Sequence, residues 1–222
     1  MKKIIKIALV GQPNVGKTLL INAISGSHLK VGNFAGVTVE KSEAKLNYKN
    51  YIINIIDLPG TYSIYGYSPE EKVARDFISQ NNYDLIINVA DSTNLERNLI
   101  LTTQIMEKNK KMILALNMSD EATKEGININ AKTLEELLGV PCVLVSANTK
   151  SNLDKLLDCI IKTYEAEYKP NKRIFSDAIE NEIQRVCEFL NAKNDPNIKG
   201  LNQNIKEIAI AYTYMTSCQN IH

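Results

Sequence analysis

The stretch that decides the fold is Gly11-Gln12-Pro13-Asn14-Val15-Gly16-Lys17-Thr18. It matches the phosphate-binding loop pattern G-x-x-x-x-G-K-[ST], which requires a strand before it and a helix after it. Both flanks are present, because residues 4–10 form an apolar run with the length of a buried strand and residues 19–24 carry apolar side chains at helical spacing. The sequence therefore predicts a strand, a phosphate-binding loop and a helix, in that order.

The residue types in this loop suit the chemistry of a bound phosphate. The glycines let successive backbone N–H groups turn towards one anion, and the helix that follows adds the positive end of its dipole. Lys17 would place its ammonium on the β- and γ-phosphates, and the Thr18 hydroxyl would be a ligand of Mg²⁺. A simple turn before a core helix would explain Gly11 but not the Gly-Lys-Thr triplet. The loop alone does not distinguish ATP from GTP, or an enzyme from a switch.

The composition carries no strong charge bias. The chain has 222 residues, with 26 basic and 25 acidic side chains and a net charge of +1. This balance shows no excess of positive charge of the kind that binds nucleic acid, so no nucleic-acid partner is expected. No apolar stretch reaches the about 18 residues of a membrane span. The four cysteines form no C-x-x-C pair, which favours a soluble chain in a reducing, cytoplasmic compartment.

Strand-like and helix-like patterns alternate along residues 1–168. Strand patterns occupy residues 37–48, 51–56, 85–90, 112–116 and 140–145. Helical patterns occupy residues 69–80, 95–108, 133–138 and 153–164. This alternation predicts an α/β fold with a mainly parallel sheet and helices on both faces. In such a sheet, ligands bind at the carboxyl ends of the strands.

The alternation of strand-like and helix-like patterns ends at Lys169-Pro170, after which only helical patterns follow. Apolar residues then step by three and four in two segments, which Asn194-Asp195-Pro196-Asn197 separates. We therefore expect a nucleotide-binding domain over residues 1–168 and a small α-helical appendage over residues 169–222. The abrupt end of the second helical pattern suggests that the appendage continues in a longer protein.

Asp57-Leu58-Pro59-Gly60 directly follows the strand expected at residues 51–56. A carboxylate at this place can hold Mg²⁺ through water, and the Gly60 N–H can meet a γ-phosphate. The same residues also suit an ordinary turn. The phosphate-binding loop upstream favours the nucleotide site.

Asn117-Met118-Ser119-Asp120 follows the strand expected at residues 112–116. The Asp120 carboxylate can accept two hydrogen bonds from the N1–H and the exocyclic amino group of guanine, whereas adenine offers no such donor pair. Asn117 can tie this loop to the phosphate-binding loop. A helix N-cap formed by Ser119 or Asp120 is the structural alternative. Ser146-Ala147-Asn148, after the next strand, can offer a backbone N–H to guanine O6, and the combination predicts a guanine nucleotide.

A polar loop with several glycines lies between Ser25 and Thr38. It suits a segment that becomes ordered only when a γ-phosphate is present. Thr38 is the natural candidate for the second hydroxyl ligand of Mg²⁺. An ordinary solvent loop is the alternative.

The candidate site comprises residues of all these loops. The expected catalytic residues are Lys17, Thr38 and Gly60, and the expected Mg²⁺ ligands are Thr18, Thr38 and Asp57. The expected nucleotide-binding residues are Gly11, Gln12, Pro13, Asn14, Val15, Gly16, Lys17, Thr18, Leu19, Gly36, Val37, Thr38, Asp57, Leu58, Pro59, Gly60, Asn117, Met118, Asp120, Ser146, Ala147 and Asn148.

Together these loops resemble the translation-factor-like class of small GTPases with a P-loop fold. The closer resemblance is to the cytoplasmic G domain of FeoB, the family of bacterial ferrous-iron transporters. The segments that carry it are residues 11–18, 31–41 (VGNFAGVTVEK), 57–64 (DLPGTYSI), 84–98 (DLIINVADSTNLERN) and 114–120 (LALNMSD). Gln12 departs from the asparagine that is common in the family. Thr61 follows Gly60 where Ras-like enzymes keep a water-orienting glutamine.

The resemblance implies a GTPase that converts GTP and water to GDP and phosphate and regulates or supports Fe²⁺ uptake. It implies that Asn14 is a catalytic residue that binds K⁺ beside the β- and γ-phosphates, where the cation neutralises charge in the transition state. It places the chain on the cytoplasmic side of the inner membrane, joined to a transmembrane portion of the same polypeptide. It also implies that residues 169–222 belong to the family's helical domain, which is associated with slowing GDP release.

Two other interpretations stay open at this point. One is a slow GTP/GDP binding switch that acts through a partner. The other is a ribosome-assembly-type GTPase, against which the neutral charge argues. A homo-oligomer also stays open.

Overall fold

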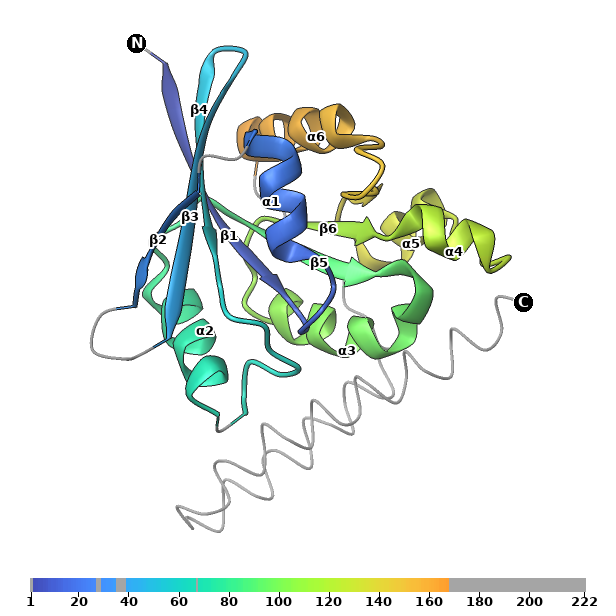
Figure 1. Ribbon diagram of the computed structural model, residues 1–222, viewed down its shortest axis with the longest axis horizontal. Helices are drawn as coiled ribbons and strands as arrows, with labels where there is room; N and C mark the ends of the chain where they lie inside the picture. The colour runs from blue at the N-terminus through green and yellow to red at the C-terminus, as the bar shows by residue number, and fades with distance from the viewer. Residues whose placement is uncertain (1, 27–28, 35–38, 67, 168–222) are drawn as a thin grey trace, which may run out of the picture. The chain divides into compact units, whose positions relative to one another are not determined.

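A seven-stranded sheet forms the centre of the computed structural model, which describes residues 2–26, 29–34, 39–66 and 68–167 (Figure 1). Its strands are β1 (Lys3–Gly11), β2 (Leu29–Asn33), β3 (Glu40–Tyr48), β4 (Tyr51–Asp57), β5 (Leu85–Asp91), β6 (Met112–Asn117) and β7 (Cys142–Leu144). The helices are α1 (Lys17–Ser25), α2 (Pro69–Gln80), α3 (Leu95–Met106), α4 (Ser119–Lys124), α5 (Ala131–Leu138) and α6 (Leu153–Glu165), and a 3₁₀ turn covers Ser92–Asn94.

The strand order places β1 at the middle of the sheet. The order is β2-β3-β4-β1-β5-β6-β7, and all pairs from β4 to β7 are parallel, whereas β2–β3 and β3–β4 are antiparallel. The α/β fold with a mainly parallel sheet is thereby confirmed. Because β1 has β4 on one side and β5 on the other, the chain winds away from β1 in both directions. Such a switch point is where open parallel sheets bind their ligands.

Helices cover both faces of the sheet, which explains the nearly continuous apolar strands. In β1, Ile5, Ile7 and Leu9 pack into one core cluster together with residues of α1 and α6. Ala8 and Val10 are also fully buried but point to the opposite face. Figure 1 shows α1 and α6 on one side of the sheet, and α2 and α3 on the other. The sequence of a strand that is buried on both faces is a nearly uninterrupted run of apolar residues.

Short elements account for the differences from the sequence-based expectation. Residues 25–38 were expected to be a loop, but β2 lies there and pairs antiparallel with β3, which begins at Glu40 rather than at residue 37. Helix α4 has six residues and follows the strand end directly, so no helical period is visible in it. Strand β7 is three residues long, shorter than the apolar run around it. Helix α2 has the expected bounds, with a complete capping box between Ser68 and Glu71.

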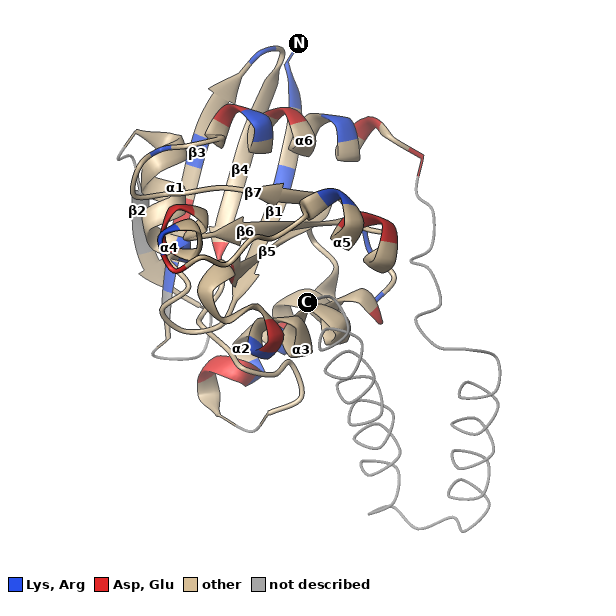
Figure 2. Cartoon of the chain, turned by 90° about the vertical axis from the view of Figure 1, so that its right-hand side faces the viewer, with Lys and Arg blue, Asp and Glu red and all other residues tan. Residues whose placement is uncertain are grey.

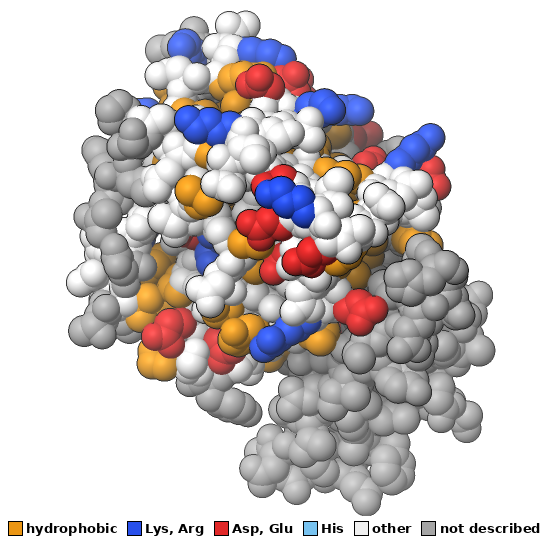
Figure 3. Space-filling model, turned by 45° about the vertical axis from the view of Figure 1, so that its right-hand side comes forward, with side chains coloured by type: hydrophobic (Ala, Val, Ile, Leu, Met, Phe, Trp, Pro, Cys, Tyr) orange, Lys and Arg blue, Asp and Glu red, His pale blue; other side chains and the backbone are white. Residues whose placement is uncertain are grey.

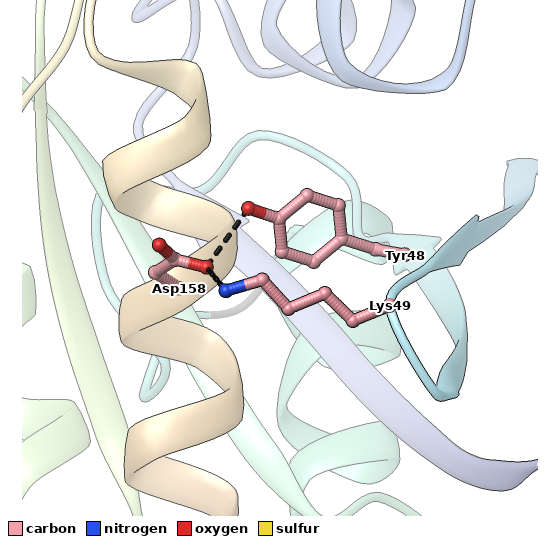
Figure 4. A network of polar contacts seen from close by, with 3 residues as sticks. All are labelled: Tyr48, Lys49 and Asp158. Carbon is pink, nitrogen blue, oxygen red and sulfur yellow. Dashed lines mark hydrogen bonds and ion pairs between the residues drawn. The ribbon is translucent and has the colours of Figure 1, made fainter.

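The turn between β3 and β4 is tied to α6 at the amino end of the parallel strands (Figure 4). The Tyr48 hydroxyl donates a hydrogen bond of 2.8 Å to Asp158, and Lys49 forms an ion pair with the same carboxylate. The hydrogen bond from Lys49 is the largest of the effects that lower the pKa of Asp158 below its usual range. Because both charged groups are exposed, we expect this pair to stabilise the fold only weakly. Lys49 therefore serves below as a control position remote from the site.

The α-helical appendage expected over residues 169–222 lies outside the described residues. Among the helices that the structure describes, none is both long and apolar enough to cross a lipid bilayer.

Candidate nucleotide-binding site

Four loops meet at the carboxyl edge of the parallel strands. The phosphate-binding loop follows β1, Asp57 ends β4, Asn117 ends β6, and Ser146 comes shortly after β7. The register aligns these ends, since Leu9 pairs with Asp57 and Asp91 pairs with Asn117. The parallel pairing thus brings together side chains that are more than 100 residues apart in sequence.

The phosphate-binding loop is shaped by positions that tolerate no ordinary side chain. A Cβ at Gly11 would lie 2.5 Å from the Val89 carbonyl oxygen. Gly16 has φ +79°, and a Cβ there would lie 2.6 Å from Nδ2 of Asn117. Asn14 also has a positive φ, 67°, which asparagine tolerates better than most residues. Helix α1 begins at the next residue after Gly16, so its free N–H groups face the loop.

Lys17, Thr18 and Asp57 form a polar cluster beneath this loop. The Thr18 hydroxyl donates to Oδ2 of Asp57 at 3.1 Å, and Nζ of Lys17 lies 3.5 Å from the Gly11 carbonyl oxygen. Burial raises the pKa of Asp57, against the opposing effects of Lys17 and Thr18. Burial likewise lowers the pKa of Lys17, against the opposing charge of Asp57. Both charges are therefore held at some cost in hydration, as is typical of groups that serve a ligand.

The Asp57 and Thr18 oxygens fit a hard cation. Asp57 is 8% exposed, and its Oδ1 is buried without a hydrogen-bond partner among the described residues. Such an orphaned carboxylate oxygen, next to a threonine hydroxyl, is a ligand set that Mg²⁺ prefers. The expected third ligand, Thr38, lies with Gly36 and Val37 outside the described residues.

Asn117 joins three loops through one buried amide. Its Nδ2 donates to the Val15 carbonyl at 2.9 Å, and its Oδ1 accepts from the Ala147 N–H at 3.0 Å. The side chain is 1% exposed. The phosphate-binding loop and the loop after β7 are therefore held in register by this residue.

Replacing Asn117 with alanine should destabilise the domain by about 2–4 kcal/mol. The change leaves one buried carbonyl and one buried N–H unpaired, and each costs roughly 1–3 kcal/mol. The measurement is urea unfolding of the nucleotide-free chain, followed by circular dichroism. Asn82→Ala is the matched control, because Asn82 is exposed, and its midpoint should stay close to the original. Equal midpoints for the two variants would refute this role of Asn117.

Asp120 lies in the first turn of α4 and presents its carboxylate at the same edge. Met118 precedes it with φ 60°, and the Ser119 N–H donates to the Val145 carbonyl at 3.2 Å, which fixes the start of the helix. Asp120 is half-buried, and both of its carboxylate oxygens are shielded from solvent. The nearby Ser146 hydroxyl is the main cause that lowers the pKa of Asp120. The carboxylate is thus an ionised acceptor at neutral pH.

Gly60 lies against the phosphate-binding loop. A Cβ at this position would come within 3.0 Å of Cα of Pro13, so only glycine fits without a shift. The Thr61 N–H donates to the Gly11 carbonyl at 3.1 Å, and the Leu58 N–H donates to the Leu9 carbonyl at 3.0 Å. These contacts hold the segment after β4 against the loop that would bind the phosphates.

The structure brings most of the expected residues to one edge and adds two that the sequence arguments missed. Asn14 and Asn148 are exposed there, and Leu19 lies on the outer side of α1 at 49% exposure. The additional residues are Arg97 and Gln104 of α3, which contact the phosphate-binding loop and the segment after Gly60. Arg97 lies inside one of the family-like segments, but nothing in its spacing indicated these contacts.

A phosphate-binding loop, an acidic strand end and an Asn-x-x-Asp loop at one edge of a mainly parallel sheet define the fold of a P-loop GTPase domain. Comparison with models of protein families identifies the family to which this GTPase domain belongs. Residues 5–160 match the family described as "Ferrous iron transport protein B". The chain belongs to this family.

Curated relatives agree with this assignment. The chain is 55% identical over 193 residues to the Fe(2+) transporter FeoB of Campylobacter jejuni, covering 86% of the chain and 31% of that relative. It is 52% identical over 208 residues to FeoB of Helicobacter pylori strain J99, covering 89% of the chain and 32% of that relative. The chain therefore spans about a third of the length of the curated relatives that it matches.

Solved structures agree as well. The cytosolic domain of T. maritima FeoB in a GDP form matches with a TM-score of 0.84 and 35% identity, covering 98% of both chains. The same domain in a GMPPNP form also has a TM-score of 0.84 and 35% identity, covering 97% of this chain and 98% of the other. The G domain of T. maritima FeoB has a TM-score of 0.69 and 46% identity over 73% of this chain and 99% of the other.

Proposed function

We propose that this chain binds GTP and GDP and hydrolyses GTP as the G domain of a ferrous-iron transporter. The observation that carries the proposal is the Asp120 carboxylate, whose two oxygens are shielded from solvent near the Ser146 hydroxyl at the same sheet edge as the phosphate-binding loop. An ionised carboxylate in this place suits the two donors of guanine. Solved relatives whose names state a GDP form and a GMPPNP form support it.

In this proposal the chain's own residues hold the nucleotide at both ends. Lys17 and the N–H groups at the start of α1 bind the β- and γ-phosphates, and Asp120 binds the base. Asn117 holds these two regions at a fixed separation through its bonds to Val15 and Ala147. Positioning of this kind, together with charge stabilisation, accounts for most of the catalysis in phosphoryl transfer.

Hydrolysis requires a water molecule in line with the γ-phosphate, and Thr61 stands where other GTPases keep a glutamine. We assign the orientation of this water to main-chain groups of residues 36–38. We assign to the Gly60 N–H a hydrogen bond to the γ-phosphate, because Gly60 lies against Pro13 of the phosphate-binding loop. Thr18, Asp57 and Thr38 would hold Mg²⁺, which neutralises phosphate charge when bound.

Asn14 is the proposed ligand of K⁺. Its side chain is exposed within the phosphate-binding loop and receives no hydrogen bond from the described residues, so its amide oxygen is open to a cation. K⁺ in this place supplies the positive charge that an arginine finger provides in other GTPases.

Wild-type phosphate release from GTP should be at least about 10-fold faster in K⁺ buffer than in Na⁺ buffer, which corresponds to about 1.4 kcal/mol of transition-state stabilisation. Asn14→Ala should abolish this difference, because the cation loses its ligand. Asn82→Ala, an exposed amide elsewhere, should keep it. If Asn14→Ala retained the full K⁺ stimulation, Asn14 would not be the ligand.

The same assay with ATP in place of GTP tests the proposed function as a whole. Multiple turnover with GTP and none with ATP is the expected result. Tight guanine-nucleotide binding with negligible turnover in both salts would instead favour a binding switch that waits for a partner. Equal activity with ATP would contradict the role of Asp120.

The remaining proposals concern the whole protein. Residues 1–168 are the G domain and residues 169–222 begin a helical domain, beyond which a transmembrane portion of the same polypeptide would place the chain at the cytoplasmic side of the inner membrane. GTP hydrolysis would then regulate or support Fe²⁺ uptake. We expect no nucleic-acid partner. Figure 3 shows basic and acidic side chains interspersed over the described surface in view, and the coloured ribbon in Figure 2 carries the same mixture of the two charges, a pattern unlike a phosphate-binding stripe.

A further inference from the structure

Gln12, the residue that departs from the family pattern, reaches out of the phosphate-binding loop to α3. Its Nε2 donates to the main-chain carbonyl of Arg97 at 2.6 Å, and the side chain is only 4% exposed. A buried amide requires such a partner. Asparagine, one methylene shorter, would not span this distance without a shift of the loop.

Arg97 contacts a second loop through its side chain. Its guanidinium lies over the ring of Tyr62, with Cζ 4.8 Å from the ring centroid. Tyr62 comes two residues after Gly60 and is 47% exposed, so few other contacts hold it. One residue in the first turn of α3 therefore touches both the phosphate-binding loop and the segment after β4.

The segment around Tyr62 is fixed closely at both ends. On one side, the Thr61 N–H is bonded to the Gly11 carbonyl and Gly60 lies against Pro13. On the other side, Ile64 is fully buried and its N–H donates to Oε1 of Gln104 at 3.0 Å. Tyr62 therefore lies between two fixed residues, and the contact of its ring with Arg97 is a third contact that sets the position of the segment next to Gly60.

We infer that Arg97 is a positioning residue for the proposed GTP hydrolysis. It couples Gln12 to Tyr62, so that the phosphate-binding loop and the Gly60 N–H keep their relative orientation around the terminal phosphate. This inference rests on the proposed function, because Gly60 acts there on the γ-phosphate. Arg97 itself is not proposed to touch the nucleotide or the attacking water.

The first test measures kcat and KM for GTP in Arg97→Met, Arg97→Lys and Gln12→Asn chains. Arg97→Met should lower kcat about 2- to 5-fold with KM within twofold, the size expected for an exposed cation–π contact of about 0.5–1 kcal/mol. Arg97→Lys should recover most of the loss, because it keeps a cation over the ring. Gln12→Asn should also lower kcat, and the Gln12→Asn/Arg97→Met double variant should be no slower than the slower single variant. Independent, multiplying effects would overturn the coupling.

The matched control removes another cation from a ring of the same segment. Nζ of Lys108 lies 4.6 Å from the ring centroid of Tyr65, but Lys108 makes no contact with the phosphate-binding loop. Lys108→Met should leave kcat within twofold of the original. An equal loss in Lys108→Met and Arg97→Met would mean that any loosening of the segment slows hydrolysis, and the specific role of Arg97 would be wrong.

A second test does not depend on hydrolysis. The chain contains no tryptophan, so Tyr62→Trp introduces a single fluorescent reporter beneath Arg97. Gln12→Asn in this background should change the tryptophan emission without nucleotide, whereas Lys108→Met should not. Unchanged emission in Gln12→Asn would overturn the link even if the wild-type chain hydrolyses GTP. Changed emission in a chain without GTPase activity would keep the link and reject the proposed function alone.

Discussion

Lys17→Met should weaken the binding of GTP and of its non-hydrolysable analogues by on the order of 10²–10³-fold. The Lys17 side chain is half-buried and interacts with the charge of Asp57, and burial lowers the pKa of Lys17, so part of the cost of desolvating this cation is already met before the ligand binds. Replacing Lys17 leaves the triphosphate without the one cationic side chain of the phosphate-binding loop. Truncating one partner of a buried charge pair costs about 3–4 kcal/mol, which corresponds to this fold-change. Isothermal titration calorimetry at fixed Mg²⁺ measures it directly.

Lys49→Met is the matched control for this experiment. Lys49 is exposed at the β3–β4 turn, where it pairs with Asp158 at the opposite edge of the sheet (Figure 4). Its replacement removes the same charge from the chain and should leave the GTP affinity within twofold. If the two variants lost affinity equally, the effect would come from net charge and the assignment of Lys17 to the phosphates would be wrong.

Asp120→Asn should invert the base preference of the chain from guanine to xanthine. The ionised carboxylate is an acceptor only, and its lowered pKa keeps it so at neutral pH. An asparagine amide offers one acceptor and one donor, which suits the N1–H and the C2 carbonyl of xanthine but leaves the guanine amino group facing a donor. Buried polar groups without partners discriminate strongly between ligands. We expect about 10²–10³-fold weaker GDP binding and a gain of similar size for the xanthosine diphosphate.

Competition between the two diphosphates for a fluorescent nucleotide measures both affinities in one assay. Asp154→Asn is the control, because Asp154 is exposed in the first turn of α6 and should keep the guanine preference. If Asp120→Asn lost both ligands equally while remaining folded by circular dichroism, Asp120 would support the loop rather than read the base.

The nucleotide-binding motifs were predictable because each depends on a few residues at fixed spacing beside a strand end. The structure places residues 11–18 and Asp57 where the sequence patterns predicted them. The bounds predicted for the long periodic helices and strands are close to those in the structure. The short elements were not predicted, since β2 and α4 contain too few residues for a period to show. Their formation depends on neighbours such as β3, which the local sequence does not specify.

Local chemistry therefore predicted the fold class, and it singled out the groups that are proposed to bind the phosphates and the base. The contacts between these groups arose from the parallel pairing of strands, which joins Asn117 to Val15 and Gln12 to Arg97 over 102 and 85 residues of sequence. Such contacts have no local signal, because a main-chain carbonyl is the same acceptor at every residue. Which carbonyl a buried amide meets depends on how the sheet and its helices pack, and that packing alone brought Arg97 between the two loops of the site.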